Sequence, residues 1–242
     1  MRVSVIIPAA GLGKRMNPHG RVKGFSKRKP FILLDKKPVI WHVLDIFKNI
    51  GLIKEIILVV NKKDLVAAKK YFESPVVKIV EGGLERKDSV YNGIKALDKE
   101  NDIVLIHDGV RPFVTKEIIL NSIRAAHQFG AAVAAVPVIP TIKRADEDGF
   151  VVSTLNRKIL WEIQTPQAFK RDVIVKAYNC RGQACLSPTD ITDDAMLVER
   201  SGHKVKIVMG SYDNIKITTP KDLITANVIL RDSERSEEDR RI

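Results

Sequence analysis

The chain has 242 residues, of which 45% are hydrophobic and 29% are charged, a composition typical of a folded globular protein. It contains no apolar segment approaching the ~20 residues of a membrane-spanning helix, and a strand follows the first two residues without a secretory leader. These features argue against a membrane or secreted protein, and we expect a cytoplasmic one. The length is sufficient for one domain with a sizeable core.

The charge of the chain is strongly positive and unevenly distributed. Lys and Arg number 41 against 29 Asp and Glu, a formal net charge of +12, and nine basic residues lie between Lys14 and Lys37 against one acid, Asp35. Such a block could bind nucleic acid, hold a highly charged small substrate, or form a solvated loop. A nucleic-acid-binding module would interleave aromatic residues with the basic ones, and only Phe25 and Phe31 do so here. Because the block directly follows a glycine-rich loop, we favour the small substrate.

The two cysteines, Cys180 and Cys185, do not form a metal motif. Their spacing lacks the second pair of ligands that a zinc site needs. We therefore expect two free thiols.

The opening segment, residues 3–16, reads V-S-V-I-I-P-A-A-G-L-G-K-R-M. An apolar strand ends at Pro8, and small residues, two glycines and two cations follow it. Glycines let backbone N–H groups approach an anion closely, so the segment predicts a phosphate-binding loop, and an ordinary strand-to-helix turn is the alternative for the glycine spacing alone. The third glycine of the dinucleotide fingerprint is replaced by Met16, and no Gly-Lys-Ser/Thr follows, so neither that fingerprint nor the P-loop identifies the nucleotide.

Short apolar strands alternate with amphipathic helices over the first 136 residues. Asn61 and Thr115 are expected N-caps, and Gly130 is expected to close a helix. This βα alternation predicts an α/β fold with a mostly parallel sheet covered by helices on both faces. The expected strands are 3–7, 56–60, 76–80, 103–106 and 131–136, and the expected helices are 38–50, 62–72, 88–97 and 116–128.

The alternation is interrupted after Pro137. Residues 140–144 and 150–154 have the pattern of two short strands joined by a tight turn, a hairpin that would project from the sheet. Its apolar positions need a surface to cover them, and a second subunit is one candidate. The main fold then resumes with expected strands at 163–169, 205–208 and 215–218 and helices at 172–178, 193–200 and from Thr219 onwards.

These elements predict one domain over residues 1–230, with a β-arm at about 138–160. The tail, residues 231–242, has almost no apolar residues, and we expect it to be frayed or disordered.

Polar clusters follow several of the expected strands. They are residues 11–15, residues 82–89, residues 108–111 and Lys216. Each cluster alone has a structural explanation as a turn, a cap or a surface charge. In open parallel sheets, however, ligands bind at the carboxyl ends of the strands, so their coincidence at one edge predicts a binding site.

Several motifs also occur in a characteristic order: A-A-G-L-G-K-R-M, K-x-F, G-G-L-E-R-K-D-S-V, H-D-G-V-R-P-F, T-I-K, Q-T-P-Q-A-F, D-I-T-D-D-A and N-I-K-I-T-T-P-K-D-L. Over roughly residues 3–230 the chain thus resembles the 2-C-methyl-D-erythritol 4-phosphate cytidylyltransferase family. The resemblance implies a single Rossmann-like domain whose projecting β-arm is exchanged across a homodimer. It implies a reaction of CTP with methylerythritol phosphate that yields 4-diphosphocytidyl-2-C-methylerythritol and pyrophosphate, in the non-mevalonate route to isoprenoid precursors. It also implies a divalent metal, usually Mg²⁺.

The same resemblance implies roles for individual residues. Arg15 and Lys29 would stabilise the transition state on the triphosphate, and Asp108 would position the metal. Thr141 and Arg157 would act from the partner subunit. The residues implied to bind CTP are Ala9, Ala10, Gly11, Gly13, Gly83, Ser89, Asp108 and Gly109, and those implied to bind the sugar phosphate are Arg111, Thr141, Arg157, Thr192 and Lys216.

Elementary electrostatics agrees with those roles. The attacking group would be a phosphate oxygen, already anionic at neutral pH, so no general base is needed. The obstacle is repulsion: the substrates together carry on the order of six negative charges, and two unit charges 4 Å apart repel by ~1 kcal/mol even in water. Positioning and fixed positive charge would therefore carry the catalysis.

The chain departs from the family pattern around the expected lysine. Thirteen residues separate Arg15 from Lys29, and Pro30 stands where a glutamine is usual, so Lys23 or Lys27 is an alternative working lysine. In addition, Leu84 replaces a frequent acid and Lys36 a frequent glycine.

Other functions remain as alternatives. A sister family that uses ribitol 5-phosphate shares most of these motifs, although the segment around Arg157 looks more like the methylerythritol branch. A basic nucleic-acid-binding α/β domain is a more remote alternative. A dinucleotide oxidoreductase would need an acid at the end of the second strand, which instead ends at Val60 and Asn61.

Overall fold

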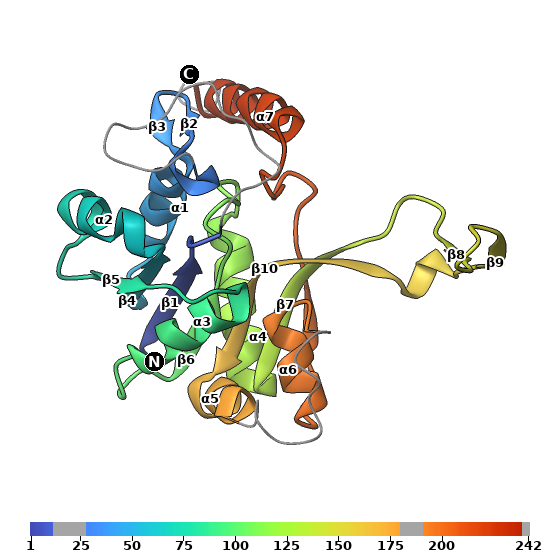
Figure 1. The fold of residues 1–242 in the computed structure, drawn as a ribbon, viewed down its shortest axis with the longest axis horizontal. Helices are drawn as coiled ribbons and strands as arrows, with labels where there is room; N and C mark the ends of the chain where they lie inside the picture. Colours follow the sequence, from blue (N-terminus) through green and yellow to red (C-terminus); the bar gives the residue numbers. More distant parts are fainter. Residues whose placement is uncertain (12–27, 180–190, 239–242) are drawn as a thin grey trace.

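The computed structural model describes residues 1–11, 28–179 and 191–238. Seven strands form one sheet in the order β11-β7-β10-β6-β1-β4-β5 (Figure 1). β10 is antiparallel to both of its neighbours and the other pairs are parallel, so the mostly parallel sheet expected from the sequence is confirmed. The strands are β1 (Val3–Pro8), β4 (Ile53–Val60), β5 (Val77–Glu81), β6 (Ile103–Ile106), β7 (Ala131–Pro137), β10 (Trp161–Lys170) and β11 (Lys206–Met209).

Helices cover both faces of this sheet. Successive residues of a strand point to opposite faces, so Val5 and Ile7 of β1 join one apolar core and Ile6 joins the other. This explains why the central strands are continuous apolar runs. One face carries α1 (Val39–Lys48), α2 (Leu65–Phe72) and α4 (Lys116–Phe129), and the other carries α3 (Arg86–Lys95), α5 (Arg171–Asn179) and α6 (Asp194–Arg200).

A third, smaller core lies beyond the carboxyl edge of the sheet. Helix α7 (Pro220–Glu238) packs there against the short hairpin of β2 (Leu33–Leu34) and β3 (Lys37–Pro38), as Figure 1 shows. The described residues also form the 3-10 turns η1 (Lys29–Phe31), η2 (Lys62–Asp64) and η3 (Arg157–Ile159). Among the described residues, no helix is long and apolar enough to cross a membrane.

The three expected cap residues are confirmed, with Asn61 at the start of η2, which leads into α2. The Asn61 side chain accepts a hydrogen bond from the N–H of Lys63, and Thr115 accepts one from the N–H of Ile118. Gly130 ends α4 with a φ of 91°, a conformation that favours glycine. These local signals depend on neighbouring residues alone, so they could be read from the sequence.

Three expectations were wrong in detail. Pro38 is the last residue of β3 and the N-cap of α1, and the helix itself begins at Val39. Residues 215–218 do not form a strand, because the segment crosses the carboxyl edge of the sheet and meets the backbone there through one hydrogen bond, from the N–H of Ile217 to the carbonyl of Val110 (2.9 Å). Helix α7 continues into the expected tail as far as Glu238, since Arg and Glu propagate an established helix well.

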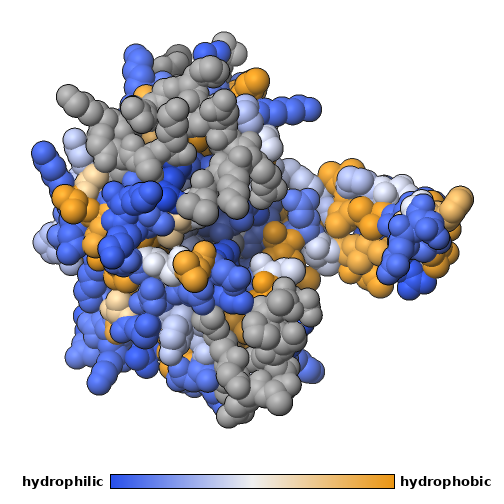
Figure 2. Space-filling model, in the orientation of Figure 1, coloured by the Kyte–Doolittle hydropathy of each residue, from blue (hydrophilic) through white to orange (hydrophobic). Residues whose placement is uncertain are grey.

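The interrupted segment forms the expected hairpin. β8 (Lys143–Ala145) pairs with β9 (Val151–Thr154), and the hairpin stands away from the body of the molecule (Figure 1). Figure 2 shows apolar surface on this arm. Its large exposed apolar side chains include Phe150, Val151, Val152 and Ile159. A hairpin this exposed does not bury its own apolar residues within one subunit.

Candidate active site

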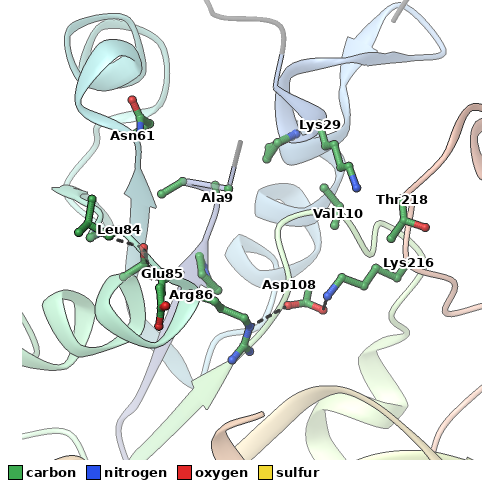
Figure 3. Close-up of a pocket in the computed structure, with 16 residues that line it drawn as sticks. Ala9, Lys29, Asn61, Leu84, Glu85, Arg86, Asp108, Val110, Lys216 and Thr218 are labelled. Carbon is green, nitrogen blue, oxygen red and sulfur yellow. Dashed lines mark hydrogen bonds and ion pairs between the residues drawn. The ribbon is translucent and has the colours of Figure 1, made fainter. Parts of the chain in front are cut away.

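A cavity of about 600 Å³ opens at the carboxyl edge of the sheet. Its walls come from segments that are far apart in the sequence, because each follows a different strand or precedes a helix (Figure 3). Lys29 and Lys216 extend into the same space in that view. The lining residues include Ala9, Ala10 and Gly11 after β1, Asn61 after β4, Gly83 to Arg86 and Ser89 around the start of α3, Asp108 and Val110 after β6, and Lys29, Pro30, Lys216 and Thr218.

The loop after β1 is held against the sheet. The N–H of Ala9 donates to the carbonyl of Val59 (2.7 Å), which continues the strand pairing to the rim. A Cβ added to Gly11 would meet no atom of the described residues within 4 Å. Packing therefore does not require glycine at this position, and the open space lies at the cavity wall.

The loop before α3 packs tightly on the loop after β1. A Cβ added to Gly82 would lie 2.5 Å from the Cβ of Ala10, and one added to Gly83 would lie 2.2 Å from the Cβ of Asp88. The buried Ser89 hydroxyl accepts from the N–H of Gly83 (3.1 Å) and donates to the carbonyl of Glu85 (3.1 Å). Both glycines are thus required by close packing, and Ser89 fixes the turn that they form.

Asp108 lies among three cations. Its carboxylate is 2.8 Å from the Nζ of Lys216, 3.5 Å from the Nε of Arg111 and 3.6 Å from the Nε of Arg86. Burial alone raises the pKa of Asp108, but Lys216, Arg86 and Arg111 together hold it well below its usual range. Asp108 is therefore ionised, and the four side chains carry a surplus of positive charge.

Arg86 connects this cluster to helix α6. Its guanidinium pairs with Asp194 at 2.7 Å, and the hydroxyl of Tyr178 donates to the other oxygen of the same carboxylate (2.6 Å). Burial lowers the pKa of Arg86, but the nearby Asp194 and Asp108 raise it above the ordinary value. Arg86 is a permanent cation with two acidic partners.

A second cavity, of about 290 Å³, lies on the other side of the cluster. Arg86, Asp108 and Lys216 line both cavities, and Arg111 and Thr192 line the second alone. The two spaces thus meet at a shared wall of charged groups. Two ligands bound in them would be adjacent.

A buried histidine supports the loop that carries Asp108. The ring nitrogens of His107 lie 3.0 Å from the carbonyl of Arg111 and 3.2 Å from the hydroxyl of Thr165, and that hydroxyl accepts from the N–H of Asp108 (3.1 Å). Burial lowers the pKa of His107 to about 4, so the ring is neutral at physiological pH. His107 lines neither cavity, and its two hydrogen bonds hold the loop that carries Asp108.

The described residues offer a partial metal site. They contain no group of three or more His, Cys, Asp and Glu side chains that could hold an ion. Asp108 is an ionised carboxylate shared by both cavities, and its Oδ1 meets Arg86 at a distance longer than a hydrogen bond. Mg²⁺ commonly takes one or two carboxylates and completes its shell with substrate phosphates and water. The donor set fits a metal that arrives with a phosphorylated ligand.

The cavities suit a pair of phosphorylated ligands. Cationic side chains, a glycine-rich turn and one carboxylate surround a polar junction, and no general base is needed to activate a phosphate oxygen. This arrangement favours phosphoryl or nucleotidyl transfer.

Comparison with known proteins decides the family. A family model described as 2-C-methyl-D-erythritol 4-phosphate cytidylyltransferase matches residues 3–232. The chain belongs to this family. The cytidylyltransferase of this name from Alkaliphilus oremlandii is 48% identical over 237 residues, which cover 95% of each chain. That of Caldanaerobacter subterraneus subsp. tengcongensis is also 48% identical, over 96% of this chain and all of the relative.

Solved structures of cytidylyltransferases share the fold. The 4-diphosphocytidyl-2C-methyl-D-erythritol synthase from Anaerococcus prevotii superposes with a TM-score of 0.82 at 37% identity, over 95% of this chain and 96% of that one. The 2-C-methyl-D-erythritol 4-phosphate cytidylyltransferase from Francisella tularensis has a TM-score of 0.78 at 28% identity, over 95% of this chain and all of that one. The single α/β domain is thus shared with cytidylyltransferases.

The structure brings most of the sequence-predicted residues together. Those at the first cavity are Ala9, Ala10, Gly11, Lys29, Gly83, Ser89, Asp108 and Lys216, and those added by the second are Arg111 and Thr192. Gly109 lies behind the wall, where an added Cβ would approach Ile40 and Ile7 at 3.1 and 3.2 Å. Gly13, Arg15, Lys23 and Lys27, with Cys180 and Cys185, lie outside the described residues.

Two predicted residues stand apart from both cavities. Thr141 is exposed before β8, and Arg157 is exposed in η3, where its guanidinium donates to the carbonyl of Ile139 (2.6 Å). Neither belongs to the described residues that line the two cavities of its own subunit. A role at the site would require a second subunit.

Sequence reasoning missed Arg86 and Asp194. Arg86 lies in the motif G-G-L-E-R-K-D-S-V and Asp194 in D-I-T-D-D-A, but the motifs alone indicate no role for either. A signal existed for Arg86, because a cation in the first turn of a helix is unfavourable next to the helix dipole and calls for an acidic partner. The partners, however, come from the loop after β6 and from α6 and are distant in sequence.

Proposed function

We propose that this chain transfers the cytidylyl group of CTP to 2-C-methyl-D-erythritol 4-phosphate, releasing pyrophosphate. The observation that carries the proposal is the junction of two cavities at Asp108, Arg86 and Lys216 in a member of the cytidylyltransferase family. A nucleotide in the larger cavity and a phosphomonoester in the smaller one would meet at that junction. The phosphomonoester oxygen could then attack the α-phosphorus of CTP.

The larger cavity would hold CTP. Ala9, Ala10 and Gly11 offer backbone groups at the end of β1, and the turn at Gly83, fixed by Ser89, faces them. The cytosine would lie against the Gly83 and Ser89 side, and the phosphates towards Lys29. Gly13, in the motif A-A-G-L-G-K-R-M, would belong to the same CTP-binding loop after β1.

Lys29 and Arg15 would stabilise the transition state. Charge builds on the departing pyrophosphate, and fixed cations in a cavity stabilise it without reorganisation of solvent. Lys29 lines the cavity, and it is a compact charge suited to one oxygen. Arg15 would add a bidentate guanidinium.

The smaller cavity would hold the sugar phosphate. Arg111, Thr192 and Lys216 supply two cations and a hydroxyl there. Thr141 and Arg157 would complete this site from a partner subunit, through a homodimer formed by the arm. The exposed apolar side chains of the arm support that assembly, since they need a second surface.

A divalent cation, Mg²⁺ in the first instance, would be held by Asp108 together with the phosphates of CTP. When bound, it would neutralise part of the triphosphate charge. Lys216, Arg86 and Arg111 would keep Asp108 ionised and oriented towards the junction of the cavities.

A pyrophosphate-release assay tests the reaction. Purified protein with Mg²⁺ and CTP is given methylerythritol phosphate, and matched reactions contain ribitol 5-phosphate in its place or UTP in place of CTP. We expect pyrophosphate and a cytidylylated product of the correct mass with CTP and methylerythritol phosphate. Activity with ribitol 5-phosphate alone would overturn the substrate, and no pyrophosphate with either acceptor would overturn the reaction.

A further inference from the structure

Arg28 is a buried arginine directly behind the wall of the larger cavity. Only 7% of it is exposed, and it does not belong to the lining residues. Its Nε pairs with Asp64 at 2.9 Å, and its Nη1 donates to the carbonyls of Ala10 (3.1 Å) and Gly11 (3.4 Å). The guanidinium therefore binds the back of the loop that follows β1.

These contacts orient a peptide group of the loop. In a trans peptide the C=O and the N–H point in opposite directions. Because Arg28 holds the carbonyl of Ala10 behind the wall, the N–H of Gly11, which belongs to the same peptide, is turned to the cavity side. An added Cβ at Gly11 meets no atom of residues 1–11, 28–179 and 191–238 within 4 Å, so packing within these ranges leaves the position open.

Arg28 also connects this loop to two other parts of the wall. Asp64, fully buried, ends η2, whose N-cap Asn61 lines the cavity. On the other side, Arg28 is the N-cap of η1, whose first residue is Lys29. One guanidinium thus ties together the loop after β1, the turn after β4 and the segment that carries Lys29.

We propose that Arg28 is a positioning residue for nucleotide binding, which rests on the proposed function. Through the carbonyls of Ala10 and Gly11 it aims the N–H of Gly11 at the phosphates of CTP, and through Asp64 it fixes the loop relative to Lys29. A guanidinium suits this role because it meets the acid through Nε and the two carbonyls through Nη1, whereas a lysine carries all of its donors on one nitrogen.

The first test is Arg28→Lys. Lysine keeps the charge that Asp64 needs, so the melting temperature stays near that of the wild type. The loss of the charge-assisted hydrogen bonds to the loop weakens CTP binding roughly tenfold, as measured by calorimetric titration with CTP and Mg²⁺ in the absence of acceptor. Unchanged CTP affinity in this variant would overturn the proposal.

A second variant separates positioning from stability. Arg28→Met combined with Asp64→Leu replaces the buried ion pair by apolar side chains, a change that is often neutral for folding. We expect this double variant to fold, but to bind CTP at least tenfold more weakly than the wild type does. A double variant that binds CTP as the wild type does would overturn the proposal, and if it fails to fold, Arg28→Lys decides alone.

Glu55→Gln is the matched control. Glu55 is another buried acid, bonded to Ser4, Lys78 and Asn101, and it does not line the cavity. We expect the Glu55→Gln substitution to lower the melting temperature and to leave the affinity for CTP unchanged. An equal loss of CTP affinity in Glu55→Gln would show that general destabilisation is the cause. Failure of the wild type itself to bind CTP would overturn the proposed function instead, so the two failures are distinguishable.

Discussion

Asp108 illustrates how one residue serves two cavities. Left alone, a buried carboxylate would be protonated or destabilising, and three cations at 2.8 to 3.6 Å make it a stable anion instead. Each of those cations in turn faces a space where a phosphorylated ligand would lie. The Asp108 carboxylate therefore orients the cationic groups of Lys216, Arg111 and Arg86.

At the same scale, Lys29→Ala is expected to reduce kcat by about 10²- to 10³-fold, because fixed charge at a developing anion is worth a few kcal/mol. The melting temperature should change little, as the ammonium lies at the cavity wall. Steady-state pyrophosphate release and thermal denaturation measure the two quantities. Lys23→Ala and Lys27→Ala are the matched controls, and full activity is expected of both. If Lys29→Ala kept full activity and either control variant lost it, Lys23 or Lys27 would be the catalytic lysine instead.

Gly11→Ala tests the open space in front of the loop. The added methyl meets no atom in the part of the chain that the structure describes, so we expect the free energy of unfolding to stay within about 0.5 kcal/mol of the wild type. It would occupy the space of the ligand, and KM for CTP should rise about tenfold or more. Gly51→Ala is the control, since its added Cβ also meets nothing but lies away from the cavity. Equal CTP kinetics in the two variants would contradict a ligand at Gly11.

At the scale of elements, the turn between β2 and β3 holds a residue in an unfavourable conformation. Asp35 and Lys36 have φ values of 45° and 61°, the left-handed region that two-residue hairpin turns require. Lys36 stands where a glycine is frequent in the family, and its positive φ strains the backbone of a residue that has a Cβ.

Lys36→Gly is therefore expected to stabilise the protein by about 0.5–1 kcal/mol, because glycine adopts this conformation without strain. Chemical denaturation measures the change. Lys37→Gly is the matched control in the adjacent strand, where the lost side chain and added flexibility destabilise. A Lys36→Gly protein less stable than the wild type would contradict the assigned turn.

At the scale of the whole molecule, the arm leaves the site of one subunit incomplete in the proposed function. Thr141 and Arg157 are exposed and line neither cavity of their own chain. If the arm reaches a second subunit, each site draws on two chains.

Complementation between inactive variants tests that arrangement. Arg157→Ala and Lys216→Ala should each have little activity, but a mixed dimer has one site with both residues intact. Random exchange of the two proteins should recover about a quarter of the wild-type activity, because half of the dimers are mixed and each has one working site of two. Pyrophosphate release after co-refolding measures it. No recovery in dimers shown to be mixed would contradict a shared site.

Phe150→Asp with Val152→Asp tests the role of the arm in assembly. Both side chains are more than half exposed, so the charges should not unfold the monomer, but they should prevent burial against a partner. We expect a folded monomer of low activity by sedimentation and circular dichroism. Lys143→Ala, at an exposed polar position of the same hairpin, should remain dimeric. A dimer in the double variant would remove the arm from the interface.

The sequence alone determined the α/β alternation, the helix caps at Asn61, Thr115 and Gly130, and the edge of the sheet at which the motifs gather. All of these depend on local periodicity and on turn chemistry within a few residues. Only the tertiary structure decided that Arg86 joins Asp108 to Asp194, that Arg28 holds the back of the Ala10 loop, and that residues 215–218 cross the sheet edge without pairing as a strand. Those contacts join residues that are 18 to 108 positions apart, and no local preference specifies which distant charges meet.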